Sequence, residues 1–71
     1  MSEKSGTSAS LGETIRDARR GRGWSQATLG ERAGVSRPTI ARVEMGNDVS
    51  TATLAKIVAA LGLTFKVEPA T

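Results

Sequence analysis

The sequence contains no cysteine, no histidine and no tyrosine, and its aromatic residues are one tryptophan and one phenylalanine. Without cysteine, the chain can form no disulfide, thiolate metal site or cysteine nucleophile. Without histidine, it lacks the commonest general base and metal ligand. The remaining carboxylates and lysines do not cluster in the sequence as catalytic groups would. We therefore expect no metal or cofactor, and an enzyme is the least favoured class of function.

Long apolar runs are also absent. No run approaches the roughly 20 residues that cross a membrane, and the N-terminus lacks the apolar core of a signal peptide. We therefore expect a cytoplasmic protein. A chain of 71 residues predicts one domain with a small core, which dimerisation would help to stabilise.

Positive charge is concentrated in one part of the chain. Residues 16–42 contain seven arginines against Asp17 and Glu31, which gives this range a net charge of +5, compared with +3 for the whole chain. The arginines are Arg16, Arg19, Arg20, Arg22, Arg32, Arg37 and Arg42. Such a field is typical of proteins that bind polyanions. Arginine is also a good helix former, so a solvated helical surface could have the same composition.

Residues 26–46 (QATLGERAGVSRPTIARVEMG) contain two short helical patterns that meet at Gly34. Each pattern has two apolar residues on one face, three or four positions apart: Leu29 and Ala33, then Ile40 and Val43. We expect a positive φ at Gly34, where the first helix ends and the chain turns. This spacing describes a helix-turn-helix, whose second helix can lie in the major groove of DNA. A generic corner between two packed helices needs similar residues and remains the alternative.

The N-terminal part of the chain predicts an arm followed by a helix. Residues 1–10 are polar and lack periodicity, which predicts a disordered arm. A first helix is expected from Leu11 to about Gly21, with Ser10 as its N-cap and with Leu11, Ile15 and Ala18 on one face. Trp24 follows that helix and is expected to pack against the core.

Serine residues mark the starts of the remaining helices. The two helices of the corner are predicted to follow the N-caps Ser25 and Ser36. A fourth helix is predicted to follow a cap at Ser50 or Thr51 and to end near Leu61. Its apolar stripe, which we assign to the core, consists of Leu54, Ile57, Val58 and Leu61.

The C-terminal tail, residues 63–71, differs in kind from the rest. Residues 63–68 (LTFKVE) alternate apolar and polar side chains, which predicts a strand. The chain has no second strand candidate, so we expect this strand to pair with that of a second copy, with Phe65 and Val67 as dimer contacts. A frayed extended tail is the alternative.

The outer face of the third predicted helix carries side chains suited to DNA. Arg37 can donate two hydrogen bonds to guanine, and Pro38 offers an apolar surface to a thymine methyl group. The predicted base contacts are Arg37, Pro38, Thr39 and Arg42. The predicted phosphate contacts, which fix register without reading sequence, are Gln26, Ser36, Asn47 and Thr51. An acid beside DNA is unfavourable, so we expect Glu44 to turn inward toward an arginine.

These residues together resemble the Cro/Xre-type helix-turn-helix family of phage repressors and bacterial regulators. The shared pattern SQxxLxxxxGVSxxxIxxxExG is represented by Ser25–Gln26, Leu29, Gly34–Val35–Ser36, Ile40, Glu44 and Gly46. The resemblance implies an all-α, compact, lambda-repressor-like bundle of four to five helices over residues 11–62. It also implies that Gln26 holds a phosphate, that positions 37, 38 and 42 face bases, and that Arg19 and Glu44 form a structural ion pair.

Three features depart from the family pattern. Gly30 stands where the family usually has alanine, at a cost of about 1 kcal/mol in helix propensity. Ala18 replaces a larger apolar residue, and the strand-like tail takes the place of a fifth helix. This ending resembles the small HipB-like antitoxins of toxin–antitoxin operons.

The leading hypothesis is a sequence-specific repressor that binds double-stranded DNA as a homodimer on a palindromic operator, in the cytoplasm and associated with the bacterial nucleoid. An antitoxin that regulates its own toxin–antitoxin operon is a more specific form of this hypothesis. The alternative is a protein-interaction module that mainly neutralises a partner toxin, with DNA binding secondary.

Overall fold

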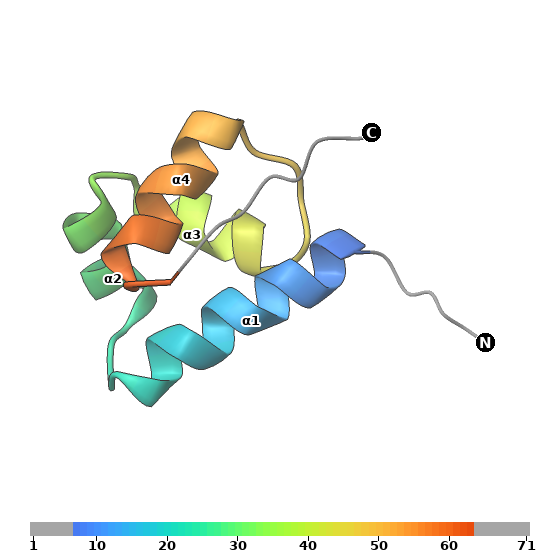
Figure 1. The fold of residues 1–71 in the computed structure, drawn as a ribbon. Coiled ribbons are helices and arrows are strands. Elements are labelled where there is room, and N and C mark those ends of the chain that lie inside the picture. The colour runs from blue at the N-terminus through green and yellow to red at the C-terminus, as the bar shows by residue number, and fades with distance from the viewer. Residues whose placement is uncertain (1–6, 64–71) are drawn as a thin grey trace.

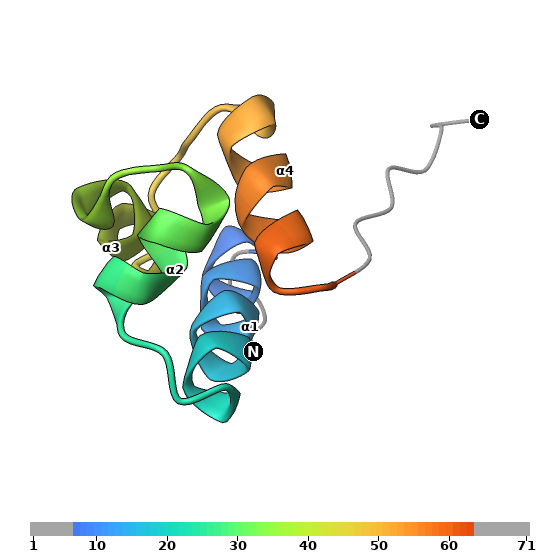
Figure 2. The same cartoon turned by 90° about the vertical axis from the view of Figure 1, so that its left-hand side faces the viewer.

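The computed structural model describes residues 7–63 of the chain, and their side chains from residue 11 onward. The four helices in this part are α1 (Thr7–Gly21), α2 (Gln26–Ala33), α3 (Arg37–Glu44) and α4 (Thr51–Ala60). The most extensively packed pairs are α2 with α3, α2 with α4, and α1 with α3. Figure 1 shows α1 running below α3 and α4, and Figure 2 shows the α2–α3 pair on one side of the molecule and α1 and α4 on the other. The described residues therefore form the predicted all-α bundle, with four helices.

The core receives apolar side chains from all four helices. Its buried members are Ile15, Leu29, Ile40, Val43, Ile57 and Leu61. Each lies on the inner face that helical periodicity predicts for its segment. Full burial of such side chains contributes about 1.5–3 kcal/mol each, so this small cluster supplies much of the driving force for folding.

Serine residues cap the last three helices. In each cap the serine Oγ accepts the backbone N–H three residues later: Ser25 from Thr28 (3.0 Å), Ser36 from Thr39 (3.3 Å) and Ser50 from Thr53 (3.0 Å). The predicted caps Ser25 and Ser36 are thus confirmed. Of the two candidates for the fourth helix, Ser50 is the cap, and Thr51 is the first residue of α4.

Helix α1 begins earlier than predicted. It starts at Thr7 instead of Leu11, so Ser10 lies within the helix and is not its N-cap. Residues 7–10 therefore belong to a helix and not to a disordered arm, while residues 1–6 lie outside the described residues. Serine and threonine are less than 1 kcal/mol worse than alanine in a helix. Polar composition alone therefore could not separate arm from helix here.

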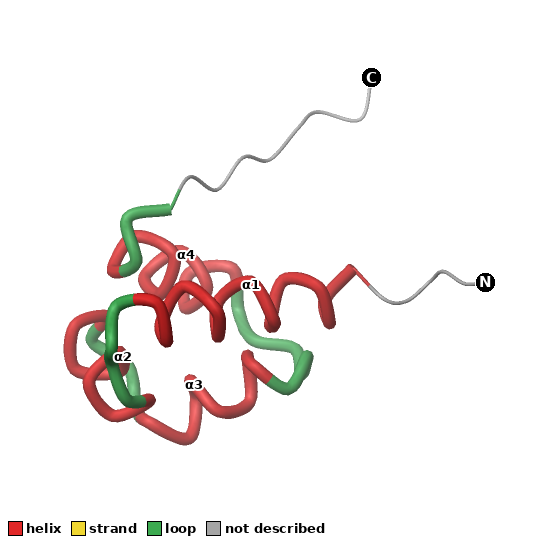
Figure 3. Tube along the Cα trace, turned by 90° about the horizontal axis from the view of Figure 1, so that it is seen from below, coloured by secondary structure: helices red, strands yellow, loops and turns green. Residues whose placement is uncertain are grey.

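The C-terminal prediction can be followed only to its first residue. Helix α4 ends at Ala60 with Leu61 as its C-cap, and Leu63 packs against the core without regular secondary structure. The rest of the predicted strand, with Phe65 and Val67, lies outside the described residues. Residues 7–63 contain no strand, as the tube in Figure 3 shows.

Gly34 ends α2 with φ of 75°, which confirms the expected left-handed turn.

Two other glycines allow close approaches within the fold. A Cβ atom at Gly30 would lie 2.8 Å from the Val35 carbonyl oxygen, and one at Gly12 would lie 2.6 Å from the Val43 carbonyl oxygen. Gly30 therefore permits the close approach of α2 to the turn that leads into α3 in this chain.

Candidate nucleic-acid interface

The outer face of α3 presents the four residues predicted to contact bases. Arg37, Pro38 and Arg42 are exposed and Thr39 is half-buried. Pro38 lies in the first turn of α3, where its missing N–H breaks no helical hydrogen bond. Among residues 11–63, no hydrogen bond or ion pair engages the guanidinium group of Arg37 or Arg42. Both cations are therefore available to an external anion or base edge.

A groove runs between this face and the start of α4. It is lined by Pro38, Thr39, Arg42, Asp48, Val49, Ser50 and Thr53. Three of the four predicted base contacts thus share one hollow with the capped N-terminus of a neighbouring helix. Thr53 was not predicted from the sequence to lie on this surface. The N-cap Ser50, which can be recognised in the sequence, marks the edge of the groove on the α4 side.

The four predicted phosphate contacts lie in different environments. Gln26 is half-buried, and its Nε2 donates to Glu44 Oε1 at 3.2 Å. The Ser36 hydroxyl is already engaged, because it accepts the Thr39 N–H and lies 2.8 Å from the Thr39 hydroxyl. Asn47 and Thr51 are exposed at the loop before α4 and at its first residue.

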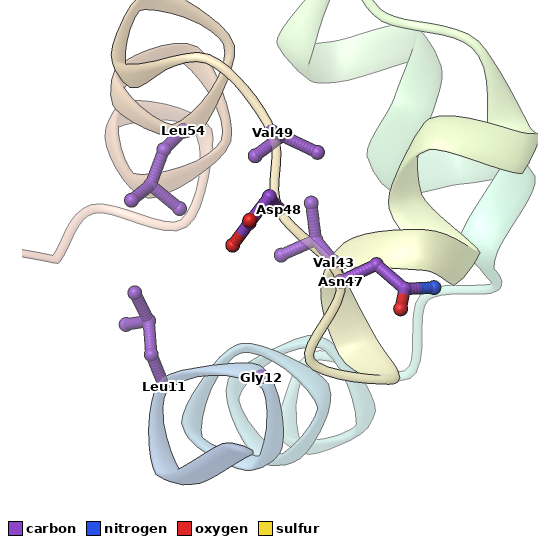
Figure 4. Close-up of a pocket in the computed structure, with 7 residues that line it drawn as sticks. All are labelled: Leu11, Gly12, Val43, Asn47, Asp48, Val49 and Leu54. Carbon is purple, nitrogen blue, oxygen red and sulfur yellow. The ribbon is translucent and has the colours of Figure 1, made fainter. Parts of the chain in front are cut away.

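Asn47 also lies at the rim of a small pocket of about 110 Å³. In Figure 4, Leu11 and Leu54 face each other across this pocket, while the Asn47 amide points away from them. The rest of the lining consists of Gly12, Val43, Asp48 and Val49. The pocket is a largely apolar hollow beside α1, and it supports no catalytic assignment.

The predicted ion pair between Arg19 and Glu44 is present and bidentate. Arg19 Nε donates to Glu44 Oε2 at 2.6 Å, and Nη2 donates to Oε1 at 2.9 Å. The two side chains are only 9% and 3% exposed. The remaining arm of the guanidinium, Nη1, donates to the Trp24 carbonyl oxygen at 2.9 Å. Arg19 therefore connects α1 to the end of α3 and to the segment before α2, and its guanidinium group is not available to DNA.

Burial raises the pKa of Glu44, but the hydrogen bonds from Arg19 and Gln26 and the positive charge of Arg19 outweigh it, so the pKa lies below its ordinary value. The hydrogen bond to Glu44 also raises the pKa of Arg19. Both groups are therefore charged at neutral pH. Three hydrogen bonds offset the cost of burying the charged Glu44 carboxylate, and removing any one donor would leave more of that cost unopposed.

Two more arginines are used within the fold. Arg22 donates to the carbonyl oxygens of Ala18, at 3.0 Å, and of Leu61, which joins the ends of α1 and α4. Arg22 and Arg32 also lie over the Trp24 ring, at 5.6 and 4.5 Å from its centre. Trp24 is half-buried and packs against the core, as the sequence predicts. Within residues 11–63, Arg37 and Arg42 have no such role, and neither does the exposed Arg20 of α1.

Met45, directly after α3, is 78% exposed and was not assigned by the sequence analysis. It is the one large apolar side chain with high exposure within the part of the chain described here.

No helix within residues 7–63 is long and apolar enough to span a membrane.

These features define a helix-turn-helix DNA-binding domain. They are the capped corner between α2 and α3, the exposed outer face of α3 and the buried carboxylate of Glu44. A family model described as Helix-turn-helix (HTH_3) matches residues 15–67. The chain belongs to this family of DNA-binding transcription regulators.

Solved structures of similar proteins agree with this assignment. The restriction-modification controller protein C.AhdI from Aeromonas hydrophila is 32% identical, with a TM-score of 0.73 over 79% of this chain and 86% of that chain. HipB in a complex with an O2 20mer is 25% identical, with a TM-score of 0.78 over 100% of both chains. The fold is also shared with a chain in a HipA–HipB–O2–O3 complex, at 22% identity and a TM-score of 0.78 over 99% of this chain and 100% of that chain. No curated protein sequence matches the chain significantly.

Proposed function

We propose that this helix-turn-helix regulator is a repressor that binds a palindromic operator as a homodimer. The observation that carries the proposal is the outer face of α3, where Arg37 and Arg42 have no partner within residues 11–63. Arg19, Arg22 and Arg32, by contrast, have partners within the same chain. Arg37 is the first residue of α3 and Arg42 lies in its last turn, so the helix presents a free guanidinium group at each end of an outer face that fits the major groove of DNA.

The proposal divides the roles of these residues, and Pro38, Thr39 and Arg42 line the groove beside α3. Arg37, Pro38, Thr39 and Arg42 contact base edges. Gln26, Ser36, Asn47 and Thr51 contact phosphates. The Ser36 hydroxyl is the least free of these groups, because it also closes the α3 cap. In a homodimer, two α3 helices would enter major grooves about 34–36 Å apart, one helical turn along the operator.

The proposed dimer contact is the C-terminal tail, with Phe65 and Val67 on one face of an intermolecular strand. Its support is the alternation of apolar and polar residues in the sequence. A second copy would supply the pairing partner that a lone strand needs.

A titration of the protein against a duplex from upstream of its own coding sequence tests the proposal, with a scrambled duplex as the comparison. We expect tighter binding to the upstream duplex and an affinity that falls steeply with salt, because released counterions drive phosphate contacts. Arg37→Ala should remove the preference, whereas Arg20→Ala removes one exposed positive charge from α1 and should leave the preference intact. Equal affinity for both duplexes would reject autoregulation, and an affinity independent of salt would reject DNA binding.

A second candidate function is neutralisation of a protein toxin, with repression of the shared operon. It is favoured by the similarity over nearly the whole chain to HipB, which is named in a complex with HipA. Co-purification with the product of the adjacent gene tests it. We expect an Arg37→Ala/Arg42→Ala variant to retain such a partner while it loses DNA. Loss of both together would place the partner on the DNA-binding face.

A further inference from the structure

Glu44 connects the buried ion pair to the start of α2. Its carboxylate accepts two hydrogen bonds from Arg19 and a third from the Nε2 of Gln26, at 3.2 Å. Gln26 is the first residue of α2, and Glu44 is the last residue of α3. One buried acid therefore links the N-terminus of one helix of the corner to the C-terminus of the other.

This contact determines which way the Gln26 amide points. An ionised carboxylate accepts hydrogen bonds and cannot donate them, so the amide atom facing Glu44 must be the nitrogen and not the oxygen. One N–H of the amide is used by Glu44. The other has no acceptor among residues 11–63. Gln26 also lies in the first turn of α2, where free backbone N–H groups favour an anion.

We propose that Glu44 is a positioning residue for the phosphate contact of Gln26. Glu44 holds the amide nitrogen so that its second N–H is presented to a DNA phosphate. The inference rests on the proposed function, in which Gln26 contacts phosphate. It adds that this contact depends on a buried acid that never touches DNA.

The same network sets the distance between the phosphate contact and the base-reading helix. Arg19 binds Glu44 at the end of α3 and, through Nη1, the Trp24 carbonyl just before the α2 cap. The start of α2 is therefore attached to α3 at two points, through Trp24 and through Gln26. Because phosphate contacts fix the register of a recognition helix, this attachment aligns α3 in the groove.

A double-mutant cycle tests the proposal. Gln26→Ala is measured in the wild-type chain and in an Arg19→Met/Glu44→Leu variant, which removes both buried charges and leaves the net charge unchanged. Apolar replacement of a whole buried ion pair is often neutral for stability. The readout is the dissociation constant for a short fluorescein-labelled duplex at one salt concentration, with circular dichroism as the check on folding.

We expect Gln26→Ala to weaken binding about tenfold in the wild-type chain, as for loss of one hydrogen bond to a charged group. In the Arg19→Met/Glu44→Leu background, the same change should weaken binding by less than about twofold. An equal loss in both backgrounds, or no loss in the wild-type chain, overturns the inference. A phosphate contact reads no sequence, so any duplex that the protein binds serves here. Failure of the operator experiment would therefore reject autoregulation and leave this test standing.

A measurement on the wild-type protein covers the case in which the charge-free variant does not fold. In heteronuclear NMR, the two protons of the Gln26 side-chain amide can be followed separately while duplex DNA is added. We expect the proton that faces Glu44 to stay nearly constant and the other to shift with saturation. Equal shifts of both protons, or a shift of neither, would contradict the proposal.

Discussion

The arginines of this molecule include one group that has partners within the fold and one group on α3 that has none among the described residues. Arg19 and Arg22 bind a buried carboxylate and the ends of helices, and Arg32 lies over the Trp24 ring. Arg37 and Arg42 lie on the outer face of α3 without a partner among residues 11–63. The comparison shows that a cluster of arginines in a sequence can combine residues that stabilise the fold with residues that have no partner in it.

The largest expected effect comes from the first group. Glu44→Ala would leave the buried guanidinium of Arg19 uncompensated and should reduce the free energy of unfolding by about 3–5 kcal/mol. Chemical denaturation followed by circular dichroism measures this. Glu31→Ala, which removes an exposed acid from α2, is the control and should change stability by less than about 0.5 kcal/mol. Similar losses in the two variants would mean that the ion pair does not stabilise the fold.

The second group should affect DNA affinity and not stability. Arg37→Ala should weaken binding to the preferred duplex by about 1–3 kcal/mol, because a bidentate base contact is lost. Its melting temperature should equal that of the wild type, since no described residue holds this side chain. A clear fall in melting temperature would place Arg37 in the structural group.

Arg22→Ala should show the opposite pattern. The change removes hydrogen bonds to the carbonyl oxygens of Ala18 and Leu61 and the contact with the Trp24 ring. We expect a loss of about 1 kcal/mol in stability. The affinity of the folded protein for DNA should change no more than in Arg20→Ala, the single-charge control on α1. A larger loss of affinity would move Arg22 into the DNA-binding group.

The smallest expected effect is on the pH dependence of stability. The pKa of Glu44 is lower in the folded state than its ordinary value, so the unfolded chain takes up this proton first as the pH falls. Stability from this group is therefore complete above the ordinary pKa and declines as the pH falls through the folded pKa. Thermal melts at neutral and acidic pH should show a smaller acid loss in Arg19→Met/Glu44→Leu than in the wild type. Equal acid losses would assign the pH dependence to other carboxyl groups.

Local features of the chain were predicted well from the sequence. The caps Ser25 and Ser36, the helix starts that follow them and the turn at Gly34 depend on interactions within three or four residues. The start of α1 was wrong by four residues, because serine and threonine fit both a helix and an arm. The ion pair between Arg19 and Glu44 was predicted through the family resemblance, since residues this far apart cannot be paired from spacing.

The sequence by itself therefore determined the helices, their inner faces and the helix-turn-helix corner, because hydrophobic periodicity and capping are written within single segments. Only the tertiary structure decided which arginines remain free and that Glu44 also holds Gln26. It also decided that Gly12 permits a close contact between α1 and α3. These outcomes depend on how segments pack in three dimensions. The orientation of a side chain across that packing is fixed by burial and by the partners it meets.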